Sequence, residues 1–122
     1  MIVRKAKPDD ALRLSALYNQ LVNNPAVSVD PEQIQALYDD ERSMLFVCEY
    51  QGDVVASALV SLCSDVMFRQ QPFAVVENVI VDAVARGLGV GSTLFKAIEA
   101  FCFNSNCSKI MLLSSVQRSD SH

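Results

Sequence analysis

Hydrophobic residues recur along this chain with the two periods that distinguish helices from strands. An amphipathic helix is predicted from about residue 8 to residues 23–25, because its apolar positions are three or four residues apart: Leu14, Leu17, Tyr18, Leu21 and Val22. A second helix is expected from Pro31 to about Asp40. Asp30 suits its N-cap, Pro31 its first position, and Gln33 the partner position of a capping box.

Apolar runs with strand character occupy residues 2–6, 44–50, 54–63, 73–81 and 109–114, and a third helix is expected over residues 90–102. The Gly52-Asp53 turn joins the second and third strands into a hairpin. The predicted order is β-α-α-β-β-β-α-β, which is α+β in its first part and α/β at its end, with a mixed, mostly antiparallel sheet flanked by helices. The hairpin argues against the parallel sheet of a Rossmann-like nucleotide-binding protein.

Length and charge narrow the classes of function. The 122 residues fit a single domain spanning residues 1–122, and 51% hydrophobic residues supply its core. Ten basic and fourteen acidic residues leave a net charge of −4, and the basic residues are scattered, so no nucleic-acid partner is expected. No membrane-spanning run and no signal peptide are seen, so no membrane association is expected.

The cysteines indicate a reducing compartment. Cys48, Cys63, Cys102 and Cys107 match no zinc-binding spacing, and the one histidine is the last residue, so no metal site is expected. Buried, reduced thiols in a cytoplasmic protein are the expected state.

The segment Arg86-Gly87-Leu88-Gly89-Val90-Gly91-Ser92 carries the chemistry. It lies between an apolar strand and a helix, so its backbone N–H groups and the helix dipole favour a phosphate. A Walker-type loop is excluded, because no lysine follows Gly91. A dinucleotide fingerprint is incomplete, because Ser92 occupies its last glycine position.

What remains is Arg-x-x-Gly-x-Gly, formed by Arg86, Gly89 and Gly91 after the strand Val79-Ile80-Val81-Asp82. This resembles the coenzyme A pyrophosphate motif of the GNAT superfamily of acyl-CoA N-acyltransferases, and the predicted element order agrees. The resemblance implies an N-acetyltransferase that moves an acetyl group from acetyl-CoA to a primary amine of a small molecule or peptide. In the family, the acceptor is chosen by the two early helices and by the loops around residues 23–29 and 65–72.

The resemblance also implies roles for individual residues. Backbone N–H groups from Leu88 to Ser92 would bind the pyrophosphate, and one N–H near Val79 would face the thioester oxygen. The expected acetyl-CoA-binding residues are Val79, Ile80, Val81, Arg86, Gly87, Leu88, Gly89, Val90, Gly91 and Ser92. The hydroxyls of Ser92 and Thr93 either reach phosphate or only suit a first helical turn.

Glu77 is the candidate catalytic base. Strand alternation predicts that it shares a face with Val75, Val79 and Val81, where a desolvated carboxylate would be a stronger base. Some GNAT enzymes carry an acid here, in a pair like Glu77-Asn78. The alternative is a carboxylate at an opening of the sheet with no chemical role.

The resembled family continues beyond the strand at 109–114 through a fourth helix, which Arg118–His122 resembles at its start, and two further strands. We therefore expect a C-terminally truncated GNAT domain whose last strand exposes Ile110 and Leu112 at a sheet edge. A homodimer or strand-swapped oligomer is expected to cover that edge. The alternative function is a catalytically impaired module that binds coenzyme A or a partner chain.

Overall fold

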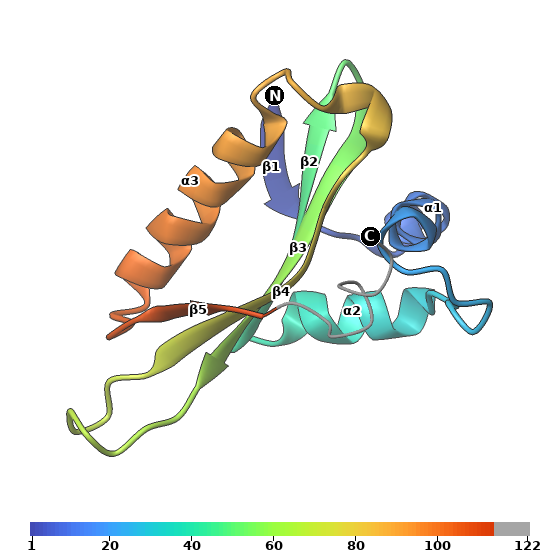
Figure 1. Cartoon of the computed structure of the whole chain (residues 1–122). Coiled ribbons are helices and arrows are strands. Elements are labelled where there is room, and N and C mark those ends of the chain that lie inside the picture. Colours follow the sequence, from blue (N-terminus) through green and yellow to red (C-terminus); the bar gives the residue numbers. More distant parts are fainter. Residues whose placement is uncertain (114–122) are drawn as a thin grey trace.

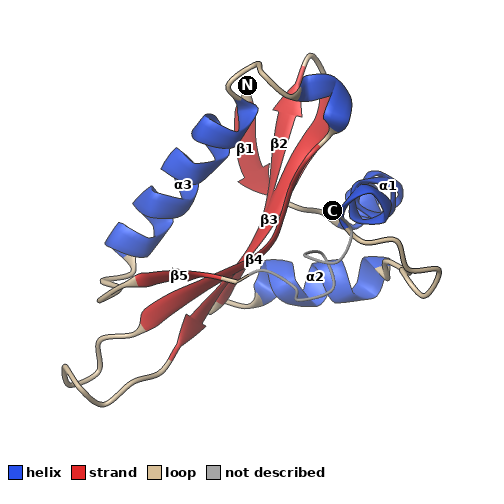
Figure 2. Cartoon of the chain, viewed as in Figure 1, coloured by secondary structure: helices blue, strands red, loops and turns tan. Residues whose placement is uncertain are grey.

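A computed structural model describes residues 1–113, which form one mixed sheet with helices on both faces (Figures 1 and 2). The strands are β1 (Ile2–Lys5), β2 (Ser43–Tyr50), β3 (Asp53–Cys63), β4 (Phe73–Val81) and β5 (Ile110–Leu112). The helices are α1 (Ala11–Leu21), α2 (Pro31–Asp39) and α3 (Val90–Asn104), with short 3-10 turns at Pro8–Asp10 and Ala83–Ala85. This is the predicted element order.

The sheet has the order β1-β2-β3-β4-β5. Neighbouring strands from β1 to β4 are antiparallel, and only β5 runs parallel to its neighbour β4. The expectation of a mostly antiparallel sheet is confirmed, and a Rossmann-like sheet is excluded. Of the predicted last strand at 109–114, the described residues place Ile110–Leu112 in register with β4, and the Ala74 N–H also bonds the Lys109 carbonyl. Ser114 and the segment Arg118–His122 lie outside the described residues.

Two apolar layers hold the helices to the sheet. The helix α3 packs on one face through Val90, Leu94, Ile98 and Cys102, which are among the most buried residues of their layer. The helices α1 and α2 cover the other face, where Leu14, Leu17 and Ile34 pack on Leu45 and Val47 (Figure 1). The 3.6-residue period predicted for α1 is thus its buried face.

The capping box expected at the start of α2 is absent. The Asp30 carboxylate accepts a hydrogen bond from the Glu32 N–H at 2.8 Å, so Asp30 is the N-cap as predicted. The Gln33 N–H bonds the Asp30 carbonyl at 3.1 Å, and no hydrogen bond joins the Gln33 side chain to the Asp30 N–H. That side chain lines the pocket described below.

A β-bulge at Asn78 reverses the alternation of β4. Asn78 has a left-handed φ of 54°, and the register shifts so that Glu77 pairs with Leu59 while Ile80 pairs with Ser57. Leu59 belongs to the layer under α1 and α2, so Glu77 lies on that face. Val79 and Val81 pack on the α3 side. The prediction that Glu77 shares a face with them is therefore wrong.

All four cysteines are free. Burial raises the pKa of the Cys102 thiol to about 11, and burial also raises the pKa of Cys48, so both are weak nucleophiles near neutral pH. Within residues 1–113, no helix is long and apolar enough to cross a membrane, and no group of three His, Cys, Asp or Glu side chains is arranged to hold a metal ion.

Candidate functional site

The turn that contains Gly87 and Gly89, called the glycine turn below, leaves the first backbone N–H groups of α3 without helical partners. Gly87 and Gly89 have φ of 83° and 81°, a left-handed conformation that L-residues adopt at a cost, and Gly89 is the N-cap of α3. The first bond of the helix runs from the Thr93 N–H to the Gly89 carbonyl at 3.1 Å. The N–H groups of Val90, Gly91 and Ser92 therefore have no acceptor within the helix, at its positive end.

Gly91 differs from the other two glycines. It lies inside α3 without a positive φ, and an added Cβ would meet only Val81 Cγ2, at an ordinary 3.8 Å. Neither backbone conformation nor packing within the described residues requires glycine here. A ligand that comes close to the first turn of α3 would explain it.

Some polar side chains around the turn are exposed to solvent, and one is already hydrogen-bonded to the backbone. Arg86 and Ser92 are exposed, so both can reach a ligand from solvent. The Thr93 hydroxyl donates to the Gly89 carbonyl at 3.0 Å. Of the two hydroxyls that the sequence left open, only that of Ser92 has its proton free for a phosphate.

In the second half of β4, which leads to this turn, the edge away from β3 has no strand partner within residues 1–113, and we call it the open edge. The strand β5 pairs with β4 at Ala74, Val75 and Val76, and the Leu113 N–H bonds the Val76 carbonyl. Beyond Val76, none of the described residues pairs with this edge of β4. The structure thus brings together the predicted strand segment Val79–Val81, its open edge and the N-terminus of α3.

A buried carboxylate attaches α1 to the start of the glycine turn. Asp82 Oδ2 accepts from Arg13 Nη2 at 2.9 Å, and Asp82 Oδ1 accepts from the Val84 N–H at 3.1 Å and from Gln20 Nε2 at 3.3 Å. Gln20 Oε1 also accepts from the Ala83 N–H at 3.0 Å. The Arg13 guanidinium and the Val84 N–H hold the pKa of Asp82 below its usual value.

Sequence reasoning missed this network, although a signal was present. Arg13 and Gln20 are seven residues apart and so lie on one face of α1, two turns from each other. Asp82 carries no motif of its own, and its partners could not be read without the tertiary structure.

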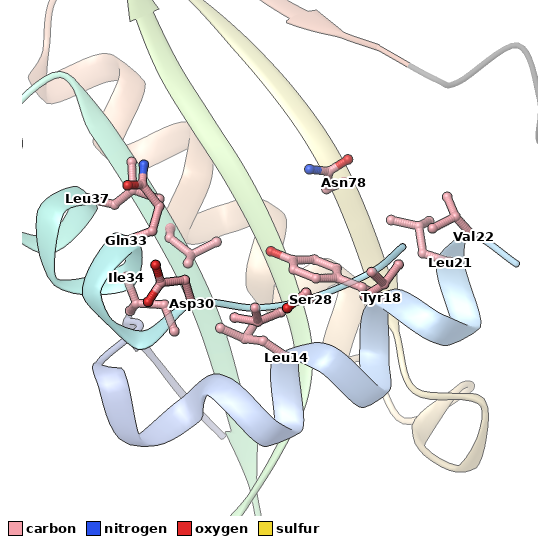
Figure 3. Close-up of a pocket in the computed structure, with 13 residues that line it drawn as sticks. Leu14, Tyr18, Leu21, Val22, Ser28, Asp30, Gln33, Ile34, Leu37 and Asn78 are labelled. Carbon is pink, nitrogen blue, oxygen red and sulfur yellow. The ribbon is translucent and has the colours of Figure 1, made fainter. Parts of the chain in front are cut away.

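A pocket of about 380 Å³ opens on the opposite face of the sheet from α3, between α1, α2 and the bulge of β4 (Figure 3). Its described apolar lining comes from both helices, the segment joining them and β2: Leu14, Leu21, Val22, Val27, Val29, Ile34, Leu37 and Leu45. Its polar lining is Tyr18, Ser28, Asp30, Gln33 and Asn78. The predicted loop at 23–29 contributes to this lining, whereas no residue of the predicted loop at 65–72 does so within the described lining.

Glu77 is half-buried on the same face of the sheet as this pocket, one residue before the pocket-lining Asn78. Asn78 belongs both to the bulge of β4 and to the lining of the pocket, so it connects this strand to the pocket. Tyr18 and Asn78 were not predicted as site residues. The left-handed conformation that places Asn78 is common for asparagine but not detectable as a strand pattern.

Comparison with known proteins decides the family. The family model described as "Acetyltransferase (GNAT) family" matches residues 14–122. The chain belongs to the GNAT acetyltransferase family. No curated protein matches it. This membership confirms the resemblance carried by Arg86, Gly89 and Gly91, and the family generally uses acetyl-CoA.

Solved structures share the GNAT fold of this chain. A candidate acetyltransferase from Agrobacterium tumefaciens str. C58 is 27% identical, with a TM-score of 0.83, over 100% of this chain and 87% of that one. Glucosamine-6-phosphate N-acetyltransferase from Arabidopsis thaliana is 20% identical, with a TM-score of 0.79, over 98% and 86%. An aminoglycoside acetyltransferase from an uncultured soil metagenomic sample is 15% identical, with a TM-score of 0.79, over 98% and 81%.

Proposed function

We propose that this GNAT protein, as one domain over residues 1–122, is an N-acetyltransferase that moves an acetyl group from acetyl-CoA to a primary amine of a small molecule or peptide. One observation carries the proposal. The free N–H groups of Val90, Gly91 and Ser92 begin the helix that follows β4, and Asn78 of the same strand lines the pocket.

The backbone would hold most of acetyl-CoA. The N–H groups from Leu88 to Ser92 bind the pyrophosphate, with each anion contact worth about 0.3–1 kcal/mol. The open edge of Val79–Val81 bonds the pantetheine arm, and an N–H near Val79 faces the thioester oxygen. Gly87 permits the tight turn, and Arg86 lies at the rim of the pyrophosphate site.

The cofactor supplies a thioester already activated for attack by an amine. The acceptor nitrogen would form a bond to the acetyl carbonyl carbon, the carbon–sulfur bond would break, and the proton that the nitrogen then loses would pass to the leaving thiolate, so the products are an amide and the free thiol. Since an ammonium group must lose a proton first, Glu77 accepts that proton directly or through water. Its half-buried place beside the pocket supports this role.

Glu77→Gln tests the base. It removes the proton acceptor while keeping the shape of the side chain, so kcat should fall about 100-fold or more, within the usual range for general-base removal. Steady-state acetylation kinetics measure this, and the Kd for acetyl-CoA should not change. A kcat within threefold of the parent would exclude Glu77 as the base.

Thermal unfolding with saturating acetyl-CoA tests the cofactor, with NADH and ATP as controls. A ligand at 100 times its Kd adds about 2.7 kcal/mol, which is roughly 5–12 °C for a domain of this size. A shift with acetyl-CoA alone supports the proposal, and no shift contradicts it. Release of coenzyme A with an amine panel then separates the enzyme from the alternative, a module that binds coenzyme A without turnover.

The exposed side of β5 supports a homodimer or strand-swapped oligomer. The strand is last in the sheet order, and Ile110, Met111 and Leu112 are all exposed although apolar. A second copy that covered them would remove an apolar sheet edge from water.

The four free cysteines support placing the protein in the cytoplasm, where thiols stay reduced.

A further inference from the structure

The chemistry of the pocket between α1, α2 and the bulge restricts what it can hold. Among the described residues that line it, none is Lys, Arg or His, and Asp30 is the one acidic residue. The Asp30 carboxylate is exposed at the start of α2, where it accepts from the Glu32 N–H. An anionic ligand would therefore find no cation in this described lining, and a ligand with several ammonium groups would find one carboxylate.

The other polar groups of the pocket are neutral. Burial raises the pKa of the Tyr18 phenol, and the Ser57 hydroxyl opposes that shift only in part, so Tyr18 stays protonated at neutral pH. Among the described residues, neither the Gln33 amide nor the Asn78 amide side chain makes a hydrogen bond. Both are therefore available to a ligand. Figure 3 shows Tyr18, Gln33 and Asn78 around one space, each from a different element.

The apolar wall gives the pocket its main source of affinity. Leu21, Val22, Val27 and Leu37 are half-buried, so each keeps apolar surface that a ligand can cover. A ligand that buries this apolar surface gains free energy through the hydrophobic effect. A phosphate bound against the same side chains would lose its hydration without gaining a cationic partner, which costs free energy. The pocket volume of about 380 Å³ is at the small end for ligand sites.

We infer, building on the proposed function, that the acceptor is a primary monoamine carried on a compact apolar body, aliphatic or aromatic. Its body lies between α1 and α2, and its nitrogen lies at Asn78, the polar group that borders the open edge of β4. Sugar phosphates and polyamines are poor ligands of this pocket. Two proteins of the same fold are named for acting on glucosamine 6-phosphate and on aminoglycosides, so the fold alone does not select the acceptor.

Two matched variants on α2 test the inference. Gln33 and Gln35 are both exposed, but Gln33 lines the pocket and Gln35 donates to Asp39 outside it. Gln33→Lys places a cation in the pocket and should weaken phenethylamine and isoamylamine at least tenfold by like-charge repulsion. Gln35→Lys adds the same charge to the same helix and should change neither amine. Acetyl-CoA affinity should be the same in both variants.

The experiment measures binding by calorimetry in the presence of coenzyme A, and acetylation separately, for phenethylamine, isoamylamine, glucosamine 6-phosphate and spermidine. We expect both monoamines to bind, and to be acetylated with a kcat/KM at least 100-fold above the other two. Binding of the monoamines without acetylation supports the pocket assignment and contradicts the proposed transferase. Acetylation that favours glucosamine 6-phosphate or spermidine, absence of monoamine binding, or equal effects of the two variants would each overturn the inference.

Discussion

Asp82 is a single residue on which the position of the glycine turn depends. Its carboxylate is almost fully buried, and it accepts from Arg13, Gln20 and the Val84 N–H. The network therefore connects α1, which lines the pocket, to the turn that precedes α3. No other group among the described residues bonds both Arg13 and Gln20.

Asp82→Asn should lower the free energy of unfolding by about 1–2 kcal/mol, because it removes a charge-assisted bond and leaves the Arg13 guanidinium without its carboxylate. Chemical denaturation measures the change. Asp53→Asn is the control, since Asp53 is an exposed aspartate in the β2–β3 hairpin and should cost little. Equal effects of the two substitutions would contradict a structural role for the Asp82 network.

Asp10 makes stability depend on pH. The Arg4 guanidinium donates to both carboxylate oxygens of Asp10, at 2.8 Å and 3.0 Å, and this holds the pKa of Asp10 below its ordinary value of 3.8. A folded pKa below the unfolded one stabilises the protein above the unfolded value, and that stabilisation is lost as pH falls through the folded value. The free energy of unfolding should therefore drop below about pH 4. In Asp10→Asn, denaturation at stepwise pH should show a lower plateau and a smaller drop. An unchanged pH profile would exclude the ion pair as its source.

At the scale of elements, the N-cap and the first turn of α3 contain two kinds of glycine. Gly89 is left-handed, whereas Gly91 is helical and has room for a Cβ. The same residue type therefore has a conformational reason at one position and, in our proposal, a ligand-related reason at the other.

Gly91→Ala should raise the free energy of unfolding of the free protein by about 0.5–1 kcal/mol, because alanine loses less backbone entropy than glycine when it becomes helical. It should also weaken acetyl-CoA binding at least tenfold, because the added methyl group stands at the first turn. Gly89→Ala should destabilise by about 1–2 kcal/mol through left-handed strain. Gly52→Ala, at φ 86° in the distant hairpin, should match that loss without affecting acetyl-CoA. Unchanged acetyl-CoA affinity in Gly91→Ala would exclude close approach at this position.

At the scale of the whole molecule, the proposed homodimer depends on the exposed edge at β5. Leu112 is 62% exposed, so a charge there should not disturb the fold of the monomer. Leu112→Lys should convert a dimer into a monomer by placing like charges across the interface. Light scattering at micromolar concentration measures the mass, and circular dichroism checks the fold. A parent protein that is itself monomeric would contradict the proposal.

Much of the architecture could be predicted because it depends on short stretches of chain. The apolar spacing of α1, the Asp30 cap of α2 and the Gly52-Asp53 hairpin are local, and each is confirmed. The capping box is absent because the Gln33 side chain makes no bond to the Asp30 N–H, a choice of rotamer that the residue type alone does not fix. The face of Glu77 failed because one left-handed residue, Asn78, inserts an extra position into the strand.

The sequence alone determined the order of the elements, the position of the glycine turn and the family resemblance. Each of these depends on residues adjacent in the chain, whose propensities and motifs act locally. Only the tertiary structure decided which face Glu77 occupies, how Asp82 connects α1 to the turn, and that Tyr18, Gln33 and Asn78 line one pocket. Those features join residues up to sixty-nine positions apart, as in the Arg13–Asp82 pair, and so depend on how the helices pack across the sheet.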